Sequence, residues 1–302
     1  MIPSTRTREI DNQLGAPGQQ FSIAVNSKSF EILTDRLYED KIQSMIRELC
    51  SNAYDSHVEA GCADKPFKLT LPTFLDPKFA VRDYGTGMDH ETVMELYSTL
   101  FATSKDTSND FTGYIGIGSK SPFAYTNTFT VTAFDGVNKR SYVVSRNENN
   151  IPEISYLGEF ECDEPCGVEV SMAADSKDSH EFTQKAQKVV IAYDSLPECN
   201  VELVVPGPIL EGEGWTVYAT PGGSWDDKYA IQQGTVVYPY RLPAYAEGFM
   251  SSGFKVIVKV PIGSVSVAAS RESLSLDDET RELVDGIIEQ TGEDIFATGN
   301  RF

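Results

Sequence analysis

Basic residues are scarce in this chain: 25 lysines and arginines stand against 45 aspartates and glutamates, which gives a formal net charge of −20. A surface of this sign repels phosphate backbones, so direct binding of DNA or RNA is not expected. An acidic excess is equally common among ordinary soluble proteins, and by itself it indicates no partner. Any nucleotide site must therefore use backbone N–H groups, a metal ion and a few lysines.

Long apolar runs are missing as well. No stretch approaches the roughly 20 apolar residues that cross a bilayer. Residues 1–20 form a polar arm without the apolar core of a secretion signal. We therefore expect a protein of the cytosol, with peripheral association with a membrane left open.

Cysteine is sparse and odd in number, which disfavours an oxidised extracellular framework and fits reduced thiols. No partner pair of His or Cys stands at metal-ligand spacing, so a zinc site is not expected. The five cysteines are Cys50, Cys62, Cys162, Cys166 and Cys199.

Length and composition indicate two domains. A chain of 302 residues with 40% hydrophobic residues can bury one large core or two ordinary ones. The Pro206-Gly207-Pro208 segment and the glycines after it mark a boundary. We therefore predict one domain over 1–205 and a smaller one over 206–302. Helices and strands mixed without strict alternation predict the α+β class, with helices on one face of a mixed sheet.

The clearest helix is predicted over 40–60, because apolar residues recur there at helical spacing and Gly61 follows. Its apolar stripe consists of Ile42, Met45, Ile46, Leu49 and Ala53. Further helices are predicted at 91–101, 179–193 and 277–290, and Glu272 is assigned to the start of the last. Strands are predicted at 67–74, 78–84, 127–134, 140–146, near 154, and at 167–172, 235–240, 255–260 and 264–268.

Three motifs carry the chemistry. On the first helix, Glu48, Asn52 and Asp55 fall within about 60° of one another at ~100° per residue. Oxygen-bearing side chains on one helix edge can orient a water molecule and hold a hard cation. Taken alone, the same edge could equally be a solvated polar face.

The second motif runs from Asp83 to Met88 and contains Gly85 and Gly87. A carboxylate at a strand end can accept the exocyclic amine of adenine, and the glycines let the backbone pass close to a flat ring. The third motif, Gly113 to Lys120, is a glycine-rich turn. Placed before a helix, its N–H groups would face an anion, and Lys120 would add charge.

Together the three motifs resemble those of the GHKL ATPases, which include gyrase-type topoisomerases, ninety-kilodalton heat-shock chaperones, sensor histidine kinases and MutL. The Glu-x-x-x-Asn-x-x-Asp helix, the Asp-x-Gly-x-Gly-Met turn and the Gly-x-x-Gly-x-Gly loop follow the family's order over about 40–172. The 102–105 segment Ala-Thr-Ser-Lys is similar to the lid of MutL relatives, and 118–121 is similar to the MORC branch.

This resemblance implies a Bergerat-type ATP-binding sandwich with a lid over about 102–119, followed by a transducer-like domain. ATP and Mg would be its ligands: Glu48 would be the catalytic base, Asn52 would hold magnesium, Asp55 would line the site and Asp83 would read adenine. Further nucleotide contacts would come from Gly85, Gly87, Met88, Thr103, Ser104, Lys105, Gly113, Gly116, Ile117, Gly118, Ser119 and Lys120. The family often has Thr after Gly in a late strand, whereas Val168 follows Gly167 here. That contact would be absent or supplied by another group.

Short strings at 234–239 and 270–274 are similar to phage rIIA-type proteins, which implies a role against host exclusion or defence inside the bacterial cytoplasm. Arg271 would then be a transducer contact toward the γ-phosphate, or else a surface arginine on a turn. The expected activity is slow ATP hydrolysis coupled to homodimer formation on ATP binding, with a host or phage protein as partner. The alternative is a nucleotide-sensing module that blocks a host protein without hydrolysis. A scaffold that has lost its ligand is a third reading.

Overall fold

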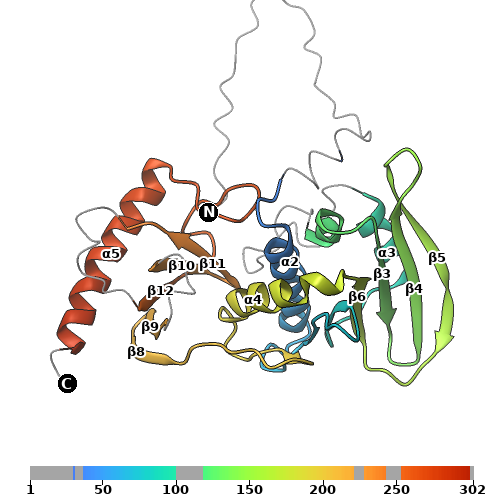
Figure 1. Cartoon of the computed structure of the whole chain (residues 1–302), viewed down its shortest axis with the longest axis horizontal. Coiled ribbons are helices and arrows are strands. Elements are labelled where there is room, and N and C mark those ends of the chain that lie inside the picture. Colours follow the sequence, from blue (N-terminus) through green and yellow to red (C-terminus); the bar gives the residue numbers. More distant parts are fainter. Residues whose placement is uncertain (1–29, 31–36, 100–117, 221–227, 243–252, 300–302) are drawn as a thin grey trace, which may run out of the picture.

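Two mixed β-sheets, each beside its own hydrophobic core, organise the chain (Figure 1). The computed structural model describes residues 30, 37–99, 118–220, 228–242 and 253–299. The expected α+β class is therefore present, with helices and mixed sheets combined. Among the helices described, none is both long enough and apolar enough to cross a membrane.

The first sheet has seven strands in the order β5-β4-β3-β6-β2-β1-β7. Neighbouring strands are antiparallel, except that β7 runs parallel to β1. The strands are β1 Lys68–Thr70, β2 Lys78–Arg82, β3 Thr128–Phe134, β4 Asn138–Arg146, β5 Pro152–Glu161, β6 Gly167–Ala173 and β7 Glu198–Cys199.

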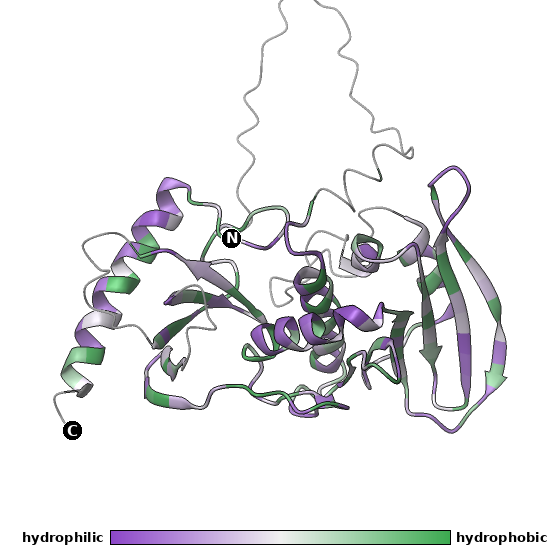
Figure 2. Ribbon diagram, in the orientation of Figure 1, coloured by the Kyte–Doolittle hydropathy of each residue, from purple (hydrophilic) through white to green (hydrophobic). Residues whose placement is uncertain are grey.

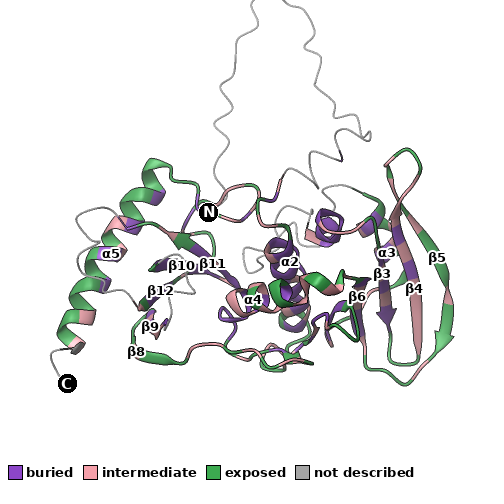
Figure 3. Ribbon diagram, in the orientation of Figure 1, coloured by how far each residue is buried: buried purple, intermediate pink, exposed green. Residues whose placement is uncertain are grey.

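One face of this sheet packs against α2, the helix with the apolar stripe. Asp40 caps its first turn by accepting a hydrogen bond from the Gln43 N–H at 3.0 Å. The whole stripe is buried, and so are several polar residues of α2 (Figure 3). The helices of this part are α2 Lys41–Glu59, α3 His90–Ser98, the 3-10 helices η1 Gly118–Ala124 and η2 Ser176–Asp178, and α4 Ser179–Val190.

The second sheet has five strands in the order β11-β10-β12-β9-β8, and β12 lies in its middle, parallel to β10. Helix α5 contributes Val284 and Ile288 to its core, while its other side is hydrophilic and exposed (Figures 2 and 3). The elements are β8 Pro208–Gly212, β9 Trp215–Ala219, β10 Tyr229–Gln233, β11 Val236–Tyr240, β12 Phe254–Val260 and α5 Asp278–Gly299.

Helix α2 lies between the two sheets (Figure 1). Its Ser51 hydroxyl is hydrogen-bonded to the Thr235 hydroxyl at 2.9 Å. Next to α4, the Ala192 carbonyl accepts a hydrogen bond from Gln232 Nε2 at 2.8 Å. The second sheet is therefore held directly against the helix that carries the first motif.

Several predicted elements need correction. The predicted strand at 264–268 was wrong: only Val267 forms a β-bridge, to Leu274, and side chains accept from the two N–H groups before it. Gln233 accepts from the Val265 N–H at 3.0 Å, and Thr280 accepts from the Ser266 N–H at 3.1 Å. Strand β1 ends at Thr70 instead of continuing to 74, since the Asn200 amide takes both the N–H and the carbonyl of Leu71. The last helix continues to Gly299, and β8, β9 and β10 were not predicted.

Two other expectations fall elsewhere. Glu272 does not start the last helix, which begins at Asp278 after an Asp277 carboxylate that accepts from the Thr280 N–H at 2.8 Å. The predicted polar arm at 1–20 and the predicted loop at 103–112 lie outside the described residues.

Candidate nucleotide site

Asp83 lies just beyond the end of β2 and is 6% exposed, and its carboxylate already accepts several hydrogen bonds. Its Oδ1 accepts hydrogen bonds from Ser56 Oγ and from the Gly85 N–H, each at 3.0 Å, and its Oδ2 accepts from the Val168 N–H at 3.1 Å. A carboxylate offers about four acceptor positions. One position on Oδ2 therefore remains uncommitted to the described residues.

Burial raises the pKa of Asp83, and the hydrogen bonds from Gly85, Ser56 and Val168 oppose that rise. The Val168 contact comes from its main chain. Whether another group supplies the contact of the family threonine stays a prediction.

The two glycines of the Asp83 turn are required for different reasons. A Cβ on Gly85 would collide with the backbone and hydroxyl of Ser56 on α2. Gly87 has a φ of +70°, and a Cβ there would lie 2.7 Å from the Phe134 carbonyl oxygen. Close packing at Gly85 and a left-handed backbone at Gly87 therefore fix the path of this turn. Met88, which follows the turn, is half-buried against the first core.

Arg82 and His57 both form hydrogen bonds to the backbone of the same turn. The Arg82 guanidinium donates to the carbonyls of Asp83 and Pro165, and its carbon lies 3.9 Å from the centre of the Phe134 ring. Tyr84 N–H donates to His57 Nε2 at 2.7 Å, so the other ring nitrogen carries the proton and donates to the Lys65 carbonyl at 3.1 Å. His57 is thus a neutral structural residue.

Glu48 lies on α2 and is 3% exposed. Its Oε2 accepts a hydrogen bond from Arg271 Nη1 at 2.7 Å, across 223 positions of sequence. Its Oε1 lies 3.5 Å from Arg47 Nε, and neither of those two atoms has a hydrogen-bond partner among the described residues. One carboxylate oxygen is therefore hydrogen-bonded to a cation, and the other accepts no hydrogen bond from the described residues.

Arg271 is itself 6% exposed, so the predicted alternative of a surface arginine was wrong. Burial acts to lower the pKa of Arg271, but the Glu48 carboxylate and Tyr238 outweigh it and raise that pKa. Tyr38 belongs to the same cluster: burial first, and then the charge of Glu48, raise the pKa of its hydroxyl. The candidate base thus belongs to a buried ionic cluster that joins α2, in the part of the chain with the first sheet, to the part that forms the second sheet and α5.

The glycine-rich loop reaches this cluster at Gly118. A Cβ on Gly118 would lie 2.8 Å from Glu48 Oε2 and 3.7 Å from Asn52 Nδ2, so the backbone of Gly118 lies against these two residues of the first motif. The element that follows is the seven-residue 3-10 helix η1 rather than an α-helix. The hydroxyls of Ser119 and Ser121 are buried and have no hydrogen-bond partner among the described residues. Such unpaired donors suit a phosphate oxygen.

Lys120 is 2% exposed, and its ammonium donates to the Leu96 carbonyl at the end of α3. Burial lowers the pKa of Lys120 to about 8. A lysine in this position keeps its charge at neutral pH and loses it under mildly alkaline conditions.

The other predicted residues divide into two groups. Asn52 is half-buried and Asp55 is buried on the same helix as Glu48, as their spacing required. Thr103, Ser104, Lys105, Gly113, Gly116, Ile117 and nearly all of the predicted lid lie outside the described residues. No group of three His, Cys, Asp or Glu side chains suited to a metal occurs in the described ranges. Magnesium held by one side-chain amide oxygen and phosphate oxygens needs no such group.

Sequence reasoning missed Ser56, Arg47 and Glu272. Ser56 follows Asp55 with no pattern to single it out, and Arg47 reads as an ordinary helix residue. Glu272 stands beside Arg271, which the resemblance did select.

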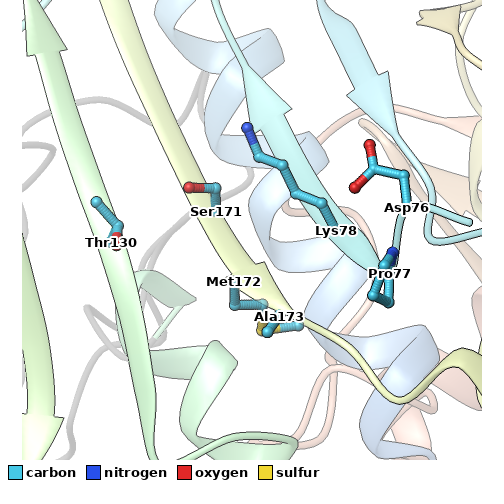
Figure 4. A pocket seen from close by; sticks show the side chains of 7 residues that line it. All are labelled: Asp76, Pro77, Lys78, Thr130, Ser171, Met172 and Ala173. Atoms are coloured by element: carbon cyan, nitrogen blue, oxygen red, sulfur yellow. The ribbon is translucent and has the colours of Figure 1, made fainter.

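A shallow depression of about 290 Å³ lies elsewhere, on strands β2, β3 and β6 (Figure 4). Its polar lining includes Lys78, Thr130 and Ser171, and Lys78 already pairs with Glu169 at 3.1 Å. None of the predicted nucleotide-site residues lines it. It therefore has no part in the candidate site.

Comparison of the sequence with models of known protein families finds no match, and comparison with curated proteins finds no significant one. The likeness to GHKL ATPases therefore depends on the motif residues and on where they lie.

Proposed function

We propose that this chain is a GHKL-type ATPase with a Bergerat-type sandwich and a transducer-like second part. One observation carries the proposal: motifs far apart in the sequence meet, because the Gly118 backbone lies against Glu48 and Asn52. On the same helix, Ser56 donates to the Asp83 carboxylate at 3.0 Å. Base, metal ligand, phosphate loop and adenine acceptor are thereby all arranged along α2.

Each residue has a chemical task in this proposal. The remaining acceptor position of Asp83 takes the adenine amine, and the buried hydroxyls of Ser119 and Ser121, with Lys120, hold phosphate oxygens. Magnesium, coordinated by Asn52 and the phosphates, would neutralise charge on the transferred group. Glu48 accepts a proton from the attacking water as the water oxygen bonds to the γ-phosphorus and the bond to ADP breaks.

The catalytic assignment is tested with Glu48→Gln, which keeps the side-chain shape and removes the base. We expect ATP affinity to stay within about threefold, while kcat falls by on the order of 100-fold or more. Glu59→Gln, an exposed substitution on the same helix, is the matched control and should hydrolyse ATP normally. Wild-type turnover in the Glu48 variant would remove Glu48 from the mechanism.

The adenine assignment is tested with Asp83→Asn. An amide can present an N–H where the carboxylate presents only oxygen, so it loses the adenine amine and can face the guanine O6. Calorimetry should show weaker ATP binding and a smaller preference for ATP over GTP. An unchanged preference would mean that Asp83 does not read the base.

A nucleotide-sensing module without turnover is the second candidate, and the Glu48–Arg271 ion pair at 2.7 Å favours it. If that pair never opens, Oε2 of Glu48 is not free to take a proton from water. Light scattering with a non-hydrolysable ATP analogue separates the two candidates: a nucleotide-dependent homodimer supports the switch, and a monomer with no ATP hydrolysis supports the sensor.

The biological role proposed for the switch is that of a phage rIIA-like protein that counteracts host defence through a protein partner in the bacterial cytoplasm. It rests on the short strings at 234–239 and 270–274. Loss of that activity in Asp83→Asn, with the fold intact, is the expected result in infected cells.

A further inference from the structure

Within the loop between β12 and α5, residues 267–274 form a turn with a defined shape. Val267 and Leu274 form an antiparallel bridge, and the Arg271 N–H donates to the Ala268 carbonyl at 2.8 Å. Arg271 has a φ of +56°, which non-glycine residues adopt only where their surroundings hold them. The loop thus presents residues 270–272 in one fixed arrangement.

Each of these three successive residues contacts the N-terminal half of α2 or the residues just before it. The Ser270 carbonyl accepts from Arg47 Nη2 at 3.0 Å, and Arg271 pairs with Glu48. The Glu272 carboxylate accepts three hydrogen bonds: from the Asp40 N–H at 2.8 Å, from Ser44 Oγ at 2.9 Å and from the Glu39 N–H at 3.0 Å. The loop therefore contacts α2 at its first turn and again at Arg47 and Glu48.

Glu272 acts as a second cap for α2. Asp40, the helix's own cap, satisfies the Gln43 N–H, while Glu272 takes backbone N–H groups that precede the helix. A carboxylate there also complements the positive end of the helix dipole. Because Glu272 comes from a loop whose Ser266 N–H is bonded to Thr280 of α5, this cap belongs to the second part of the chain.

We infer that Glu272 is a positioning residue for Glu48, through which the second sheet and α5 set the place of the base-bearing helix. The inference rests on the proposed ATPase function. Asp40 and Glu48 are eight residues apart, about 12 Å along the helix. A shift of the 270–272 loop must therefore move the helix start and the counter-ion of the base together.

The test compares Glu272→Gln with wild type in the full chain. The amide keeps the shape of the side chain, but it loses the negative charge and one of the two oxygens that accept the three hydrogen bonds. We therefore expect kcat to fall about five- to tenfold, with KM within twofold of wild type. Glu272→Asp, charged but shorter, should fall between the two. Glu282→Gln on the exposed side of α5 is the control and should behave as wild type.

Hydrogen exchange of the nucleotide-free proteins gives a readout independent of catalysis. The backbone amides of residues 39–50 should exchange faster in Glu272→Gln than in wild type, and at the wild-type rate in Glu282→Gln. Wild-type exchange there, or a change in KM alone, overturns the positioning role. If wild type binds or hydrolyses no ATP, the proposed function fails, and the exchange result alone still decides whether Glu272 fixes α2.

Discussion

Two buried carboxylates of this protein are stabilised by different kinds of hydrogen-bond donor. Asp83 is held by neutral donors, the Ser56 hydroxyl and two backbone N–H groups, all from the first part of the chain. Glu48 is held by guanidinium groups, and the one at 2.7 Å belongs to the second part. The hydrogen bonds of Asp83 therefore lie within one sheet-and-helix unit, whereas the contacts of Glu48 come from two. In the proposed ATPase, nucleotide binding would need the first unit alone, and turnover would need both.

The largest expected effect comes from breaking the ionic side of this comparison. Arg271→Met removes the counter-ion of Glu48 and leaves a carboxylate buried beside Arg47 alone. Removing one partner of a buried ion pair costs about 3–5 kcal/mol of unfolding free energy, which urea denaturation can measure.

The double variant Arg271→Met with Glu48→Gln isolates the pair itself. Because the buried charge is then gone, we expect it to be more stable than Arg271→Met alone. A single variant within about 1 kcal/mol of wild type would show that the pair is not a structural link.

A smaller effect is expected on the neutral side, from Gly85→Ala. The added Cβ meets the Ser56 backbone, which cannot rotate away, so the turn and Asp83 must move. We expect a loss of about 1–3 kcal/mol together with weaker ATP binding.

Gly286→Ala on α5 is the matched control, since a Cβ there meets nothing within 4 Å. Alanine within a helix should raise stability by up to about 1 kcal/mol. Equal melting temperatures for the two variants would contradict the packing described for Gly85.

The smallest expected effect is a pH dependence that sharpens the role of Lys120. Its folded-state pKa of about 8 lies below the ordinary 10.5, so phosphate binding should weaken above pH 8 by up to about tenfold per unit. Calorimetry of ATP binding from pH 7 to 9.5 measures this, and Lys120→Arg should remove the dependence.

Stability should follow pH in the opposite sense. Between about pH 8 and 10.5 the unfolded chain binds the Lys120 proton and the folded chain does not, so the unfolded state binds more protons and stability rises with pH. Below pH 8 the charge stays buried and its desolvation cost is present in full. A fall in both affinity and stability over this range would exclude Lys120 as the titrating group.

The sequence predicted the first part better than the second. The α2 stripe follows helical periodicity, and the strands predicted at 127–134 and 140–146 are present as β3 and β4. Strands β8 and β9 fall in a glycine- and proline-rich stretch that reads as a linker. Strand β9 pairs with β12, which is remote in sequence, and β8 joins the sheet only through β9.

The same limit applies to the site. Spacing alone places Glu48, Asn52 and Asp55 on one helix, and the glycines at 85 and 87 signal a close approach of backbone. No local pattern could pair Arg271 with Glu48, or Glu272 with the start of α2, because those contacts join residues more than 220 positions apart.

The central place of β12 in the second sheet has a consequence for the chain as it leaves the ribosome. Strands β9 and β10 emerge first but share no partner until Phe254–Val260 arrives between them. Domains tend to fold in the order of synthesis. The first sheet and α2 can therefore assemble, and bury Glu48, before Arg271 has been synthesised to form an ion pair with it. Translation itself thus delays the moment at which the candidate base receives its counter-ion.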